Sequence, residues 1–84
     1  EPGLYRTADL PALGYPVPPG VAVVAEMGDF ARWLLLRPAA PDYLPSPILR
    51  ATYAHTRLLH IHPFAAGNGR VARLLLTLIL RRAG

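Results

Sequence analysis

Apolar side chains recur at three- and four-residue steps between residues 21 and 37, where proline is absent. The positions that carry this period are Val21, Val24, Met27, Phe30, Trp33 and Leu34. Steps of three and four place side chains on one face of a helix, and the charged residues of this stretch fall on the other side. The pattern therefore predicts an amphipathic helix over residues 21–37.

A second helix is predicted over residues 46–60. Ser46 followed by Pro47 marks its start, because serine caps helix N-termini and proline is well tolerated at the first helical position. Pro63 ends it, since the residue before a proline is disfavoured in the α region. We expect its apolar stripe to consist of Ile48, Thr52, His55 and Leu59, widened by Leu58.

A third helix is predicted over residues 69–82, after a loop at residues 61–69. Arg81 and Arg82 suit its C-terminal end, where the helix dipole favours positive charge. We expect its buried face to consist of Leu74, Leu75, Leu78 and Ile79.

The first twenty residues show no helical period. Their prolines are Pro2, Pro11, Pro16, Pro18 and Pro19. Proline removes a backbone donor and fixes φ, so we expect an irregular or β-hairpin segment with short extended pieces at residues 4–7 and 15–17. The 84 residues are thus predicted to form one mainly α domain, or a fragment of one, with about three helices.

Charge is unevenly distributed along the chain. Six arginines and no acidic residue follow residue 42. A block this basic favours an anionic partner, and nucleotide phosphate, nucleic acid and an acidic protein surface all qualify. Nucleic acid is the least expected of these, because aromatic residues are sparse in this block and it contains no known reader motif.

The composition also bears on compartment and source. The chain has no cysteine and no visible signal peptide, which favours a cytoplasmic protein. Its longest apolar run, at residues 74–80, is far shorter than the ~20 residues that span a bilayer, so no membrane partner is expected. All nine basic residues are arginine, a composition typical of a GC-rich bacterial genome.

Gly67, Asn68 and Gly69 form the most informative local pattern. Two glycines around an asparagine allow a tight turn that exposes backbone N–H groups at a helix N-terminus. Such a terminus binds anions, most often phosphate. Arg70 and Arg73 lie three residues apart on the first turn of that helix, and two guanidinium groups suit a polyphosphate.

His62 precedes this turn. A histidine near two arginines and a positive helix end is expected to favour its neutral form, which a general base requires. The loop therefore combines a base with a phosphate-binding turn. This combination suggests attack of a hydroxyl group on phosphorus.

Residues 62–73, HPFAAGNGRVAR, resemble the active loop of the Fic family. The family pattern is H-x-F-x-(D/E)-G-N-G-R-x-x-R, and every fixed position matches except the fifth, Ala66. The resemblance extends over most of the chain. It implies a helical core and, over residues 1–20, the family's flap, which aligns the target polypeptide.

The resemblance implies a protein adenylyltransferase, which transfers AMP from ATP to a Ser, Thr or Tyr hydroxyl of a target protein. His62 would be the catalytic base. Gly67, Asn68, Gly69, Arg70 and Arg73 would bind the phosphates of ATP, and Pro63 and Phe64 would shape the loop. The oligomeric state is not implied.

Ala66 departs from the family pattern. The family places there an acidic residue that helps to hold Mg²⁺, and Ala66 supplies no ligand oxygen. Mg²⁺ binding stays possible, because this ion often binds largely through substrate phosphates and waters. A substitute carboxylate could come only from a distant residue such as Asp29 or Asp42. Three interpretations stay open: a slowed transferase, a pseudoenzyme that binds a nucleotide or a protein, and an introduced substitution in an active enzyme.

For the other polar and aromatic residues we expect roles outside the chemistry of the loop. His55 and His60 are expected to be structural, because their spacing is poor for a shared metal. Phe30 and Trp33 are expected in the core. Tyr5 and Tyr15 either touch a target or cover the groove. Solvent-exposed or capping roles are expected for Arg50, Arg57, Arg81 and Arg82.

Overall fold

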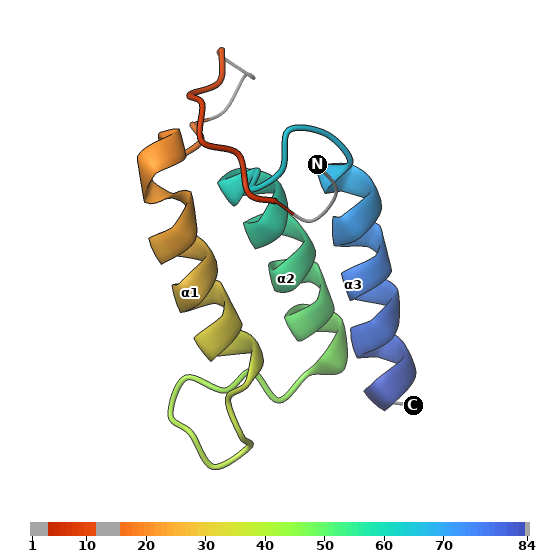
Figure 1. Ribbon diagram of the computed structural model, residues 1–84. Coiled ribbons are helices and arrows are strands. Elements are labelled where there is room, and N and C mark those ends of the chain that lie inside the picture. The colour runs from red at the N-terminus through yellow and green to blue at the C-terminus, as the bar shows by residue number, and fades with distance from the viewer. Residues whose placement is uncertain (1–3, 12–15, 84) are drawn as a thin grey trace.

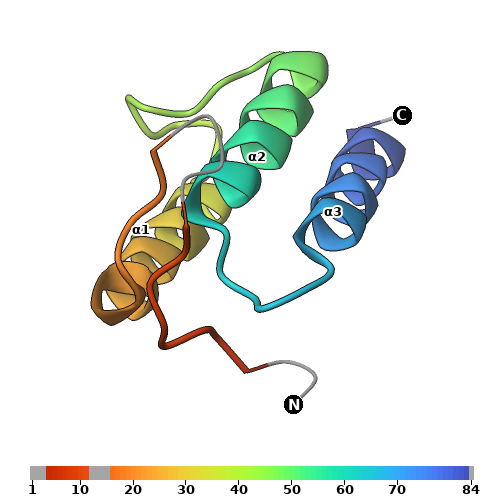
Figure 2. The same cartoon turned by 90° about the horizontal axis from the view of Figure 1, so that it is seen from above.

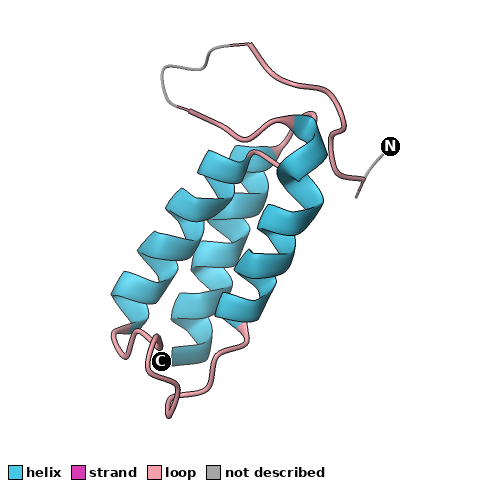
Figure 3. Ribbon diagram, turned by 90° about the vertical axis from the view of Figure 1, so that its left-hand side faces the viewer, coloured by secondary structure: helices cyan, strands magenta, loops and turns pink. Residues whose placement is uncertain are grey.

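The computed structural model describes residues 4–11 and 16–83. It contains three α-helices, α1 (Val23–Leu34), α2 (Pro47–Ile61) and α3 (Asn68–Ala83), with a short 3₁₀ turn η1 (Gly20–Ala22) before α1. The predicted mainly α class with about three helices is confirmed. No strand occurs among the described residues, so residues 4–11 and 16–19, called the N-terminal segment below, are irregular (Figure 3). Tyr15 lies outside the described residues.

The three helices lie side by side and alternate in direction (Figure 1). α2 makes its most extensive contacts with α3 and also packs against α1. The connection from α2 to α3 and the N-terminal segment lie at one end of the bundle, and the connection from α1 to α2 lies at the other (Figures 1 and 2). No helix in residues 4–11 or 16–83 has the length and apolar character needed to cross a membrane.

The core is small and built partly from alanines. Its buried side chains are Val23, Phe30, Ala54, Leu58, Ile61 and Ala72. Trp33 packs against this cluster and stacks on Phe30, with ring centroids 6.2 Å apart. The expected core roles of Phe30 and Trp33 are therefore confirmed. Small residues on α2 and α3 allow these two helices to approach closely, which increases dispersion contacts.

The buried stripe predicted for α2 is wrong. Ile48 is 69% exposed and Thr52 is also exposed, whereas His55 and Leu59 are half-buried. Leu58 was placed correctly. The residues that α2 buries are Ala51, Ala54, Leu58 and Ile61. The difference has a physical reason: the buried face of α2 carries two small alanines, so a large apolar side chain such as Ile48 lies on another face.

The predicted buried faces of α3 and α1 need the same kind of correction. Leu75 and Ile79 are half-buried and pack against the core, as predicted for α3. Leu74, however, is 59% exposed and Leu78 is also exposed, and both line an open apolar groove of about 280 Å³. Ala72 is the apolar residue of α3 that is fully buried. Val21 and Val24 are exposed, and Val23 is buried in their place.

Helix ends follow local signals more closely. The Ser46 hydroxyl accepts a hydrogen bond from the Leu49 N–H at 3.2 Å, so Ser46 caps α2 as predicted. α1 is shorter than the predicted 21–37, because the chain forms η1 before it and leaves the helix at Leu35. α2 and α3 begin and end within about one residue of the predicted bounds.

Candidate functional site

The motif loop joins α2 to α3 at residues 62–67. His62 caps the C-terminal end of α2 in the left-handed conformation, with φ of 52°. Pro63 follows as one of the most deeply buried side chains. The loop is therefore anchored in the protein at the end where the helix stops.

Asn68 closes this loop with its side chain. Its Oδ1 accepts a hydrogen bond from the Phe64 N–H at 2.9 Å, and its Nδ2 donates to the Phe64 carbonyl at 2.8 Å. Only 4% of Asn68 is exposed. The sequence placed Asn68 in a phosphate-binding turn but gave no indication of this contact with Phe64. The general tendency of asparagine side chains to hydrogen-bond nearby backbone groups is the one sequence signal that could have suggested it.

We expect Asn68→Ala to lower the free energy of unfolding by about 1–3 kcal/mol, because both Phe64 backbone groups lose their partner. Asn68→Asp is the matched variant: its carboxylate still accepts from the Phe64 N–H but cannot donate to the carbonyl. Denaturant unfolding should therefore rank the natural protein above both variants. An alanine variant as stable as the natural protein would contradict this role.

Glycine is favoured at the two positions of the turn for different structural reasons. Gly67 has φ of 83°, which strains any residue with a side chain. Gly69 lies under Arg73: a Cβ atom there would stand 3.1 Å from Arg73 Nη1. The Arg73 guanidinium thus lies beside the first turn of α3.

A groove of about 840 Å³ lies between the motif loop and the N-terminal segment. From the loop side it is lined by residues 64–67 and by Arg70 and Val71. From the other side it is lined by residues 4–8. His62 and Arg73 do not line it, so the predicted site residues are divided between the groove and its surroundings.

His62 is half-buried beside the last turn of α2. Its Nδ1 lies 3.4 Å from the carbonyl oxygen of Leu59. A carbonyl can only accept, so this contact requires the proton on Nδ1. In a neutral ring that tautomer leaves Nε2 with the free lone pair that a base needs.

The described residues do not fit a Mg²⁺ site. Ala66 is exposed and lines the groove without a ligand atom. Asp29 is ion-paired with Arg32 on α1, and Asp42 lies in the connection at the far end of the bundle (Figure 1). Within residues 4–11 and 16–83, no three His, Asp or Glu side chains cluster around a possible ion. Neither Asp29 nor Asp42 therefore takes the place of the missing acidic ligand.

Two arginines expected to be solvent-exposed or capping have defined partners. Arg57 pairs with Glu26 at 3.2 Å and so links α2 to α1. Arg50 donates to the carbonyls of Leu44 and Pro45 and stacks over Tyr43. Both residues therefore support the bundle, Arg57 between two helices and Arg50 at the start of α2.

Arg81 and Arg82 are exposed in the last turn of α3.

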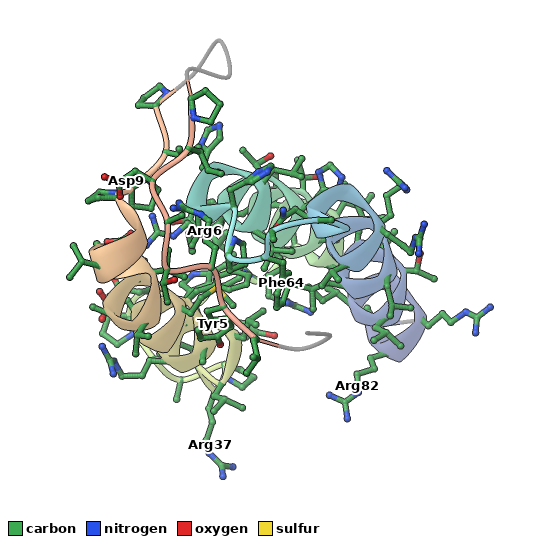
Figure 4. The ribbon with its side chains drawn as sticks, turned by 45° about the horizontal axis from the view of Figure 1, so that its top comes forward. Tyr5, Arg6, Asp9, Arg37, Phe64 and Arg82 are labelled. Atoms are coloured by element: carbon green, nitrogen blue, oxygen red, sulfur yellow. The ribbon has the colours of Figure 1, made fainter. Side chains whose placement is uncertain are left out.

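Tyr5 belongs to the N-terminal segment and packs on Phe64 with ring centroids 5.9 Å apart (Figure 4). Tyr5 thus covers the loop and forms part of the groove wall. Beside it lies Arg6, whose burial no sequence pattern indicated.

The fold and the loop define a class: a helical domain in which a glycine-rich turn with two arginines starts one helix and a histidine ends the preceding one. Residues 1–80 match the model of the Fic/DOC family. The chain belongs to this family. The close agreement of the loop sequence with the family pattern, apart from Ala66, is consistent with that membership.

Relatives named protein adenylyltransferase Fic match over the whole chain. The mosquito Aedes aegypti protein is 41% identical over 85 residues, the Drosophila persimilis protein 45%, and the Nematostella vectensis protein 40% over 84 residues. The chain spans 16% to 19% of the length of these proteins. They are animal proteins and give no support to the expected bacterial source.

Proposed function

We propose that this chain is the motif-bearing part of a protein adenylyltransferase that transfers AMP from ATP to a hydroxyl group of a target protein. The observation that carries the proposal is the segment of residues 62–73. It joins a histidine at the end of one helix to a glycine-rich turn, of the kind that binds phosphate, at the start of the next helix. Relatives that match over the whole chain are named as protein adenylyltransferases, which supports this activity.

In the proposed reaction His62 accepts the proton of a Ser, Thr or Tyr hydroxyl through Nε2. The hydroxyl oxygen attacks the α-phosphorus of ATP, forming a new P–O bond. The bond from that phosphorus to the β-phosphate oxygen breaks, and diphosphate leaves. AMP remains on the target, so the phosphate chain must be held in line while the proton moves.

The turn at residues 67–69 supplies backbone N–H groups for the phosphates. Arg70, which lines the groove, and Arg73, which lies beside Gly69, supply positive charge for the outer phosphates. The wall formed by residues 4–8 is the surface along which the target polypeptide lies in this proposal. The transfer is expected to be slow, because the loop has no carboxylate at Ala66.

Ala66→Asp is the experiment that tests the function. The side chain at this position is exposed on the groove, so an aspartate fits there without displacing a neighbour. With Mg²⁺ and labelled ATP, we expect AMP transfer to rise at least about tenfold over the natural protein, because each ~1.4 kcal/mol of transition-state stabilisation is a factor of ten. Transfer is measured onto the protein itself and onto a panel of candidate targets.

Ala65→Asp is the matched control. Ala65 is the preceding residue, is also exposed and also lines the groove, so this variant adds the same charge to the same loop. We expect no comparable gain from it. Equal gains would show that charge alone raises the rate, and absence of labelled product from every variant would reject the transferase.

A second candidate function is a nucleotide- or protein-binding domain without turnover. It is favoured by one observation, the missing carboxylate at Ala66. Calorimetry with ATP on the same proteins separates the two candidates. Nucleotide binding without a covalent product, even from Ala66→Asp, would support the binding domain.

A further inference from the structure

Arg6 is a charged residue held almost entirely inside the protein, with 6% of its surface exposed. Its guanidinium group donates to backbone carbonyl oxygens in two directions. The acceptors are the oxygens of His62 at 2.5 Å, Pro18 at 2.6 Å, Ala8 at 2.9 Å and Ile61 at 3.1 Å. A buried cation is stable only when it has hydrogen-bond partners, and these four bonds give each of the three guanidinium nitrogens of Arg6 an acceptor.

Arg6 also binds three successive carbonyls around His62. The side chain bonds the Ile61 and His62 oxygens, and the Arg6 backbone N–H donates to the Pro63 oxygen at 2.7 Å. These carbonyls lie at the C-terminal end of α2, where helix carbonyls lack intrahelical partners and the dipole is negative. The cation therefore sits where the helix end favours it.

This contact fixes a backbone conformation that is uncommon. His62 has φ of 52°, in the left-handed region that residues with side chains adopt infrequently. The backbone angles set the direction of the Cα–Cβ bond and limit the rotamers of the side chain. Holding the carbonyls before, at and after His62 therefore restricts the directions in which its imidazole can point.

The other half of the guanidinium fixes the N-terminal segment. The Ala8 and Pro18 carbonyls come from the two described parts of that segment, on either side of residues 12–15. In Figure 4 the Arg6 side chain points toward the motif loop, whereas those of Arg37 and Arg82 extend outward. One side chain thus connects the histidine backbone to the segment that forms the groove wall.

We infer that Arg6 is a positioning residue for the transfer reaction: it clamps the carbonyls of residues 61–63 and so aims the His62 imidazole, while it fixes the wall on which a target lies. This inference rests on the proposed function of His62 as the base. Arg6 itself contacts none of the reacting atoms.

The first measurement uses the natural protein. NMR should show an Arg6 Nε–H signal that exchanges slowly with solvent, because the Arg6 side chain is buried and its Nε–H donates to the His62 carbonyl. Arg37 is the internal reference, since its side chain is exposed and its Nε–H should exchange fast. Equal exchange at the two arginines would overturn the clamp.

The second measurement uses Arg6→Lys and Arg6→Gln in the Ala66→Asp protein. An ammonium group keeps the charge, but one nitrogen cannot reach four carbonyls in two directions as a guanidinium does. We expect kcat to fall about 10- to 100-fold, as for a misplaced catalytic group. The KM for ATP should stay within about threefold, because Arg6 binds no phosphate.

The His62 Cα chemical shift reports its backbone angles and should leave the left-handed range in both variants. Asp9→Asn is the matched control: Asp9 accepts from the Gly20 N–H at 2.7 Å in the same segment but does not contact residues 61–63. We expect its His62 shift to remain at the natural value.

Two outcomes are informative. If Arg6→Lys is folded and leaves both the His62 shift and kcat unchanged, the inference is overturned. If the His62 shift moves while no protein in the series, the Ala66→Asp parent included, transfers AMP, the proposed function fails but the hold of Arg6 on the His62 backbone is supported.

Discussion

Replacing His62 with asparagine should lower the rate of AMP transfer by about 100- to 10,000-fold, the usual contribution of general base catalysis. The contact between Nδ1 and the Leu59 carbonyl leaves Nε2 unprotonated in the neutral ring. An amide at this position has no comparable basic nitrogen. The attacking hydroxyl would then lose its proton acceptor while the turn at residues 67–69, the proposed phosphate site, stayed intact.

Asparagine is the informative replacement because His62 is left-handed. Asparagine is one of the few residues that adopt this conformation readily, so the variant keeps the backbone that alanine would strain. The measurement is transfer of labelled AMP in both the natural and the Ala66→Asp proteins. ATP affinity, measured by calorimetry, should change little, because the proposed role of His62 is to accept the proton of the target hydroxyl and not to bind the phosphates.

His60→Asn is the control for this prediction. His60 is an exposed residue of α2, two positions before the loop, and the change is chemically identical. We expect its transfer rate to remain near that of the parent protein. If His62→Asn retains full transfer activity, another group accepts the proton and the assigned role of His62 is wrong.

The parts of this structure that could be predicted are those set by local chemistry. Ser46 and Pro63 mark helix ends through backbone effects that need no knowledge of the fold. The loop of residues 62–73 was likewise recognisable, because its residue types lie together in sequence. The location of α2 and α3 and the identity of the motif loop follow from such signals.

The parts that were missed depend on which surfaces meet. Leu74 is large and apolar, yet it is exposed because α2 packs against the side of α3 that carries Ala72. No local pattern distinguishes those two sides. The same holds for Arg6, whose acceptors on α2 lie more than fifty residues away in sequence. Burial of a side chain by a distant partner is a property of the packed domain.

Packing also explains why the N-terminal segment and the motif loop form one unit. Asp9 accepts from the Gly20 N–H, so the start of the segment is tied to the turn before α1. Arg6 ties the same segment to the end of α2. The groove wall is therefore attached at two points, and its stability depends on the close approach of backbone at both.

The backbone approaches most closely at Gly20. Gly20→Ala should therefore lower the free energy of unfolding by about 3 kcal/mol, at the upper end of overpacking costs. A Cβ atom there would stand 2.1 Å from the Thr7 carbonyl oxygen and 2.9 Å from the Ala8 nitrogen. Both are backbone atoms, so no rotamer change relieves the clash. The segment must move away, and the bonds from Arg6 to the Ala8 carbonyl and from the Gly20 N–H to Asp9 weaken with it.

Gly28→Ala makes the same chemical change in the middle of α1 and should have the opposite sign. Its Cβ would meet only Arg32 Nη1, at an ordinary 3.8 Å, and alanine is favoured over glycine inside a helix by about 0.5–1 kcal/mol. Thermal unfolding followed by circular dichroism checks both variants, with about 4–8 °C expected for each kcal/mol in a domain of this size. A Gly20→Ala protein that melts no lower than the natural one would mean that the N-terminal segment is not held against the turn before α1, and the groove would then lack a fixed wall.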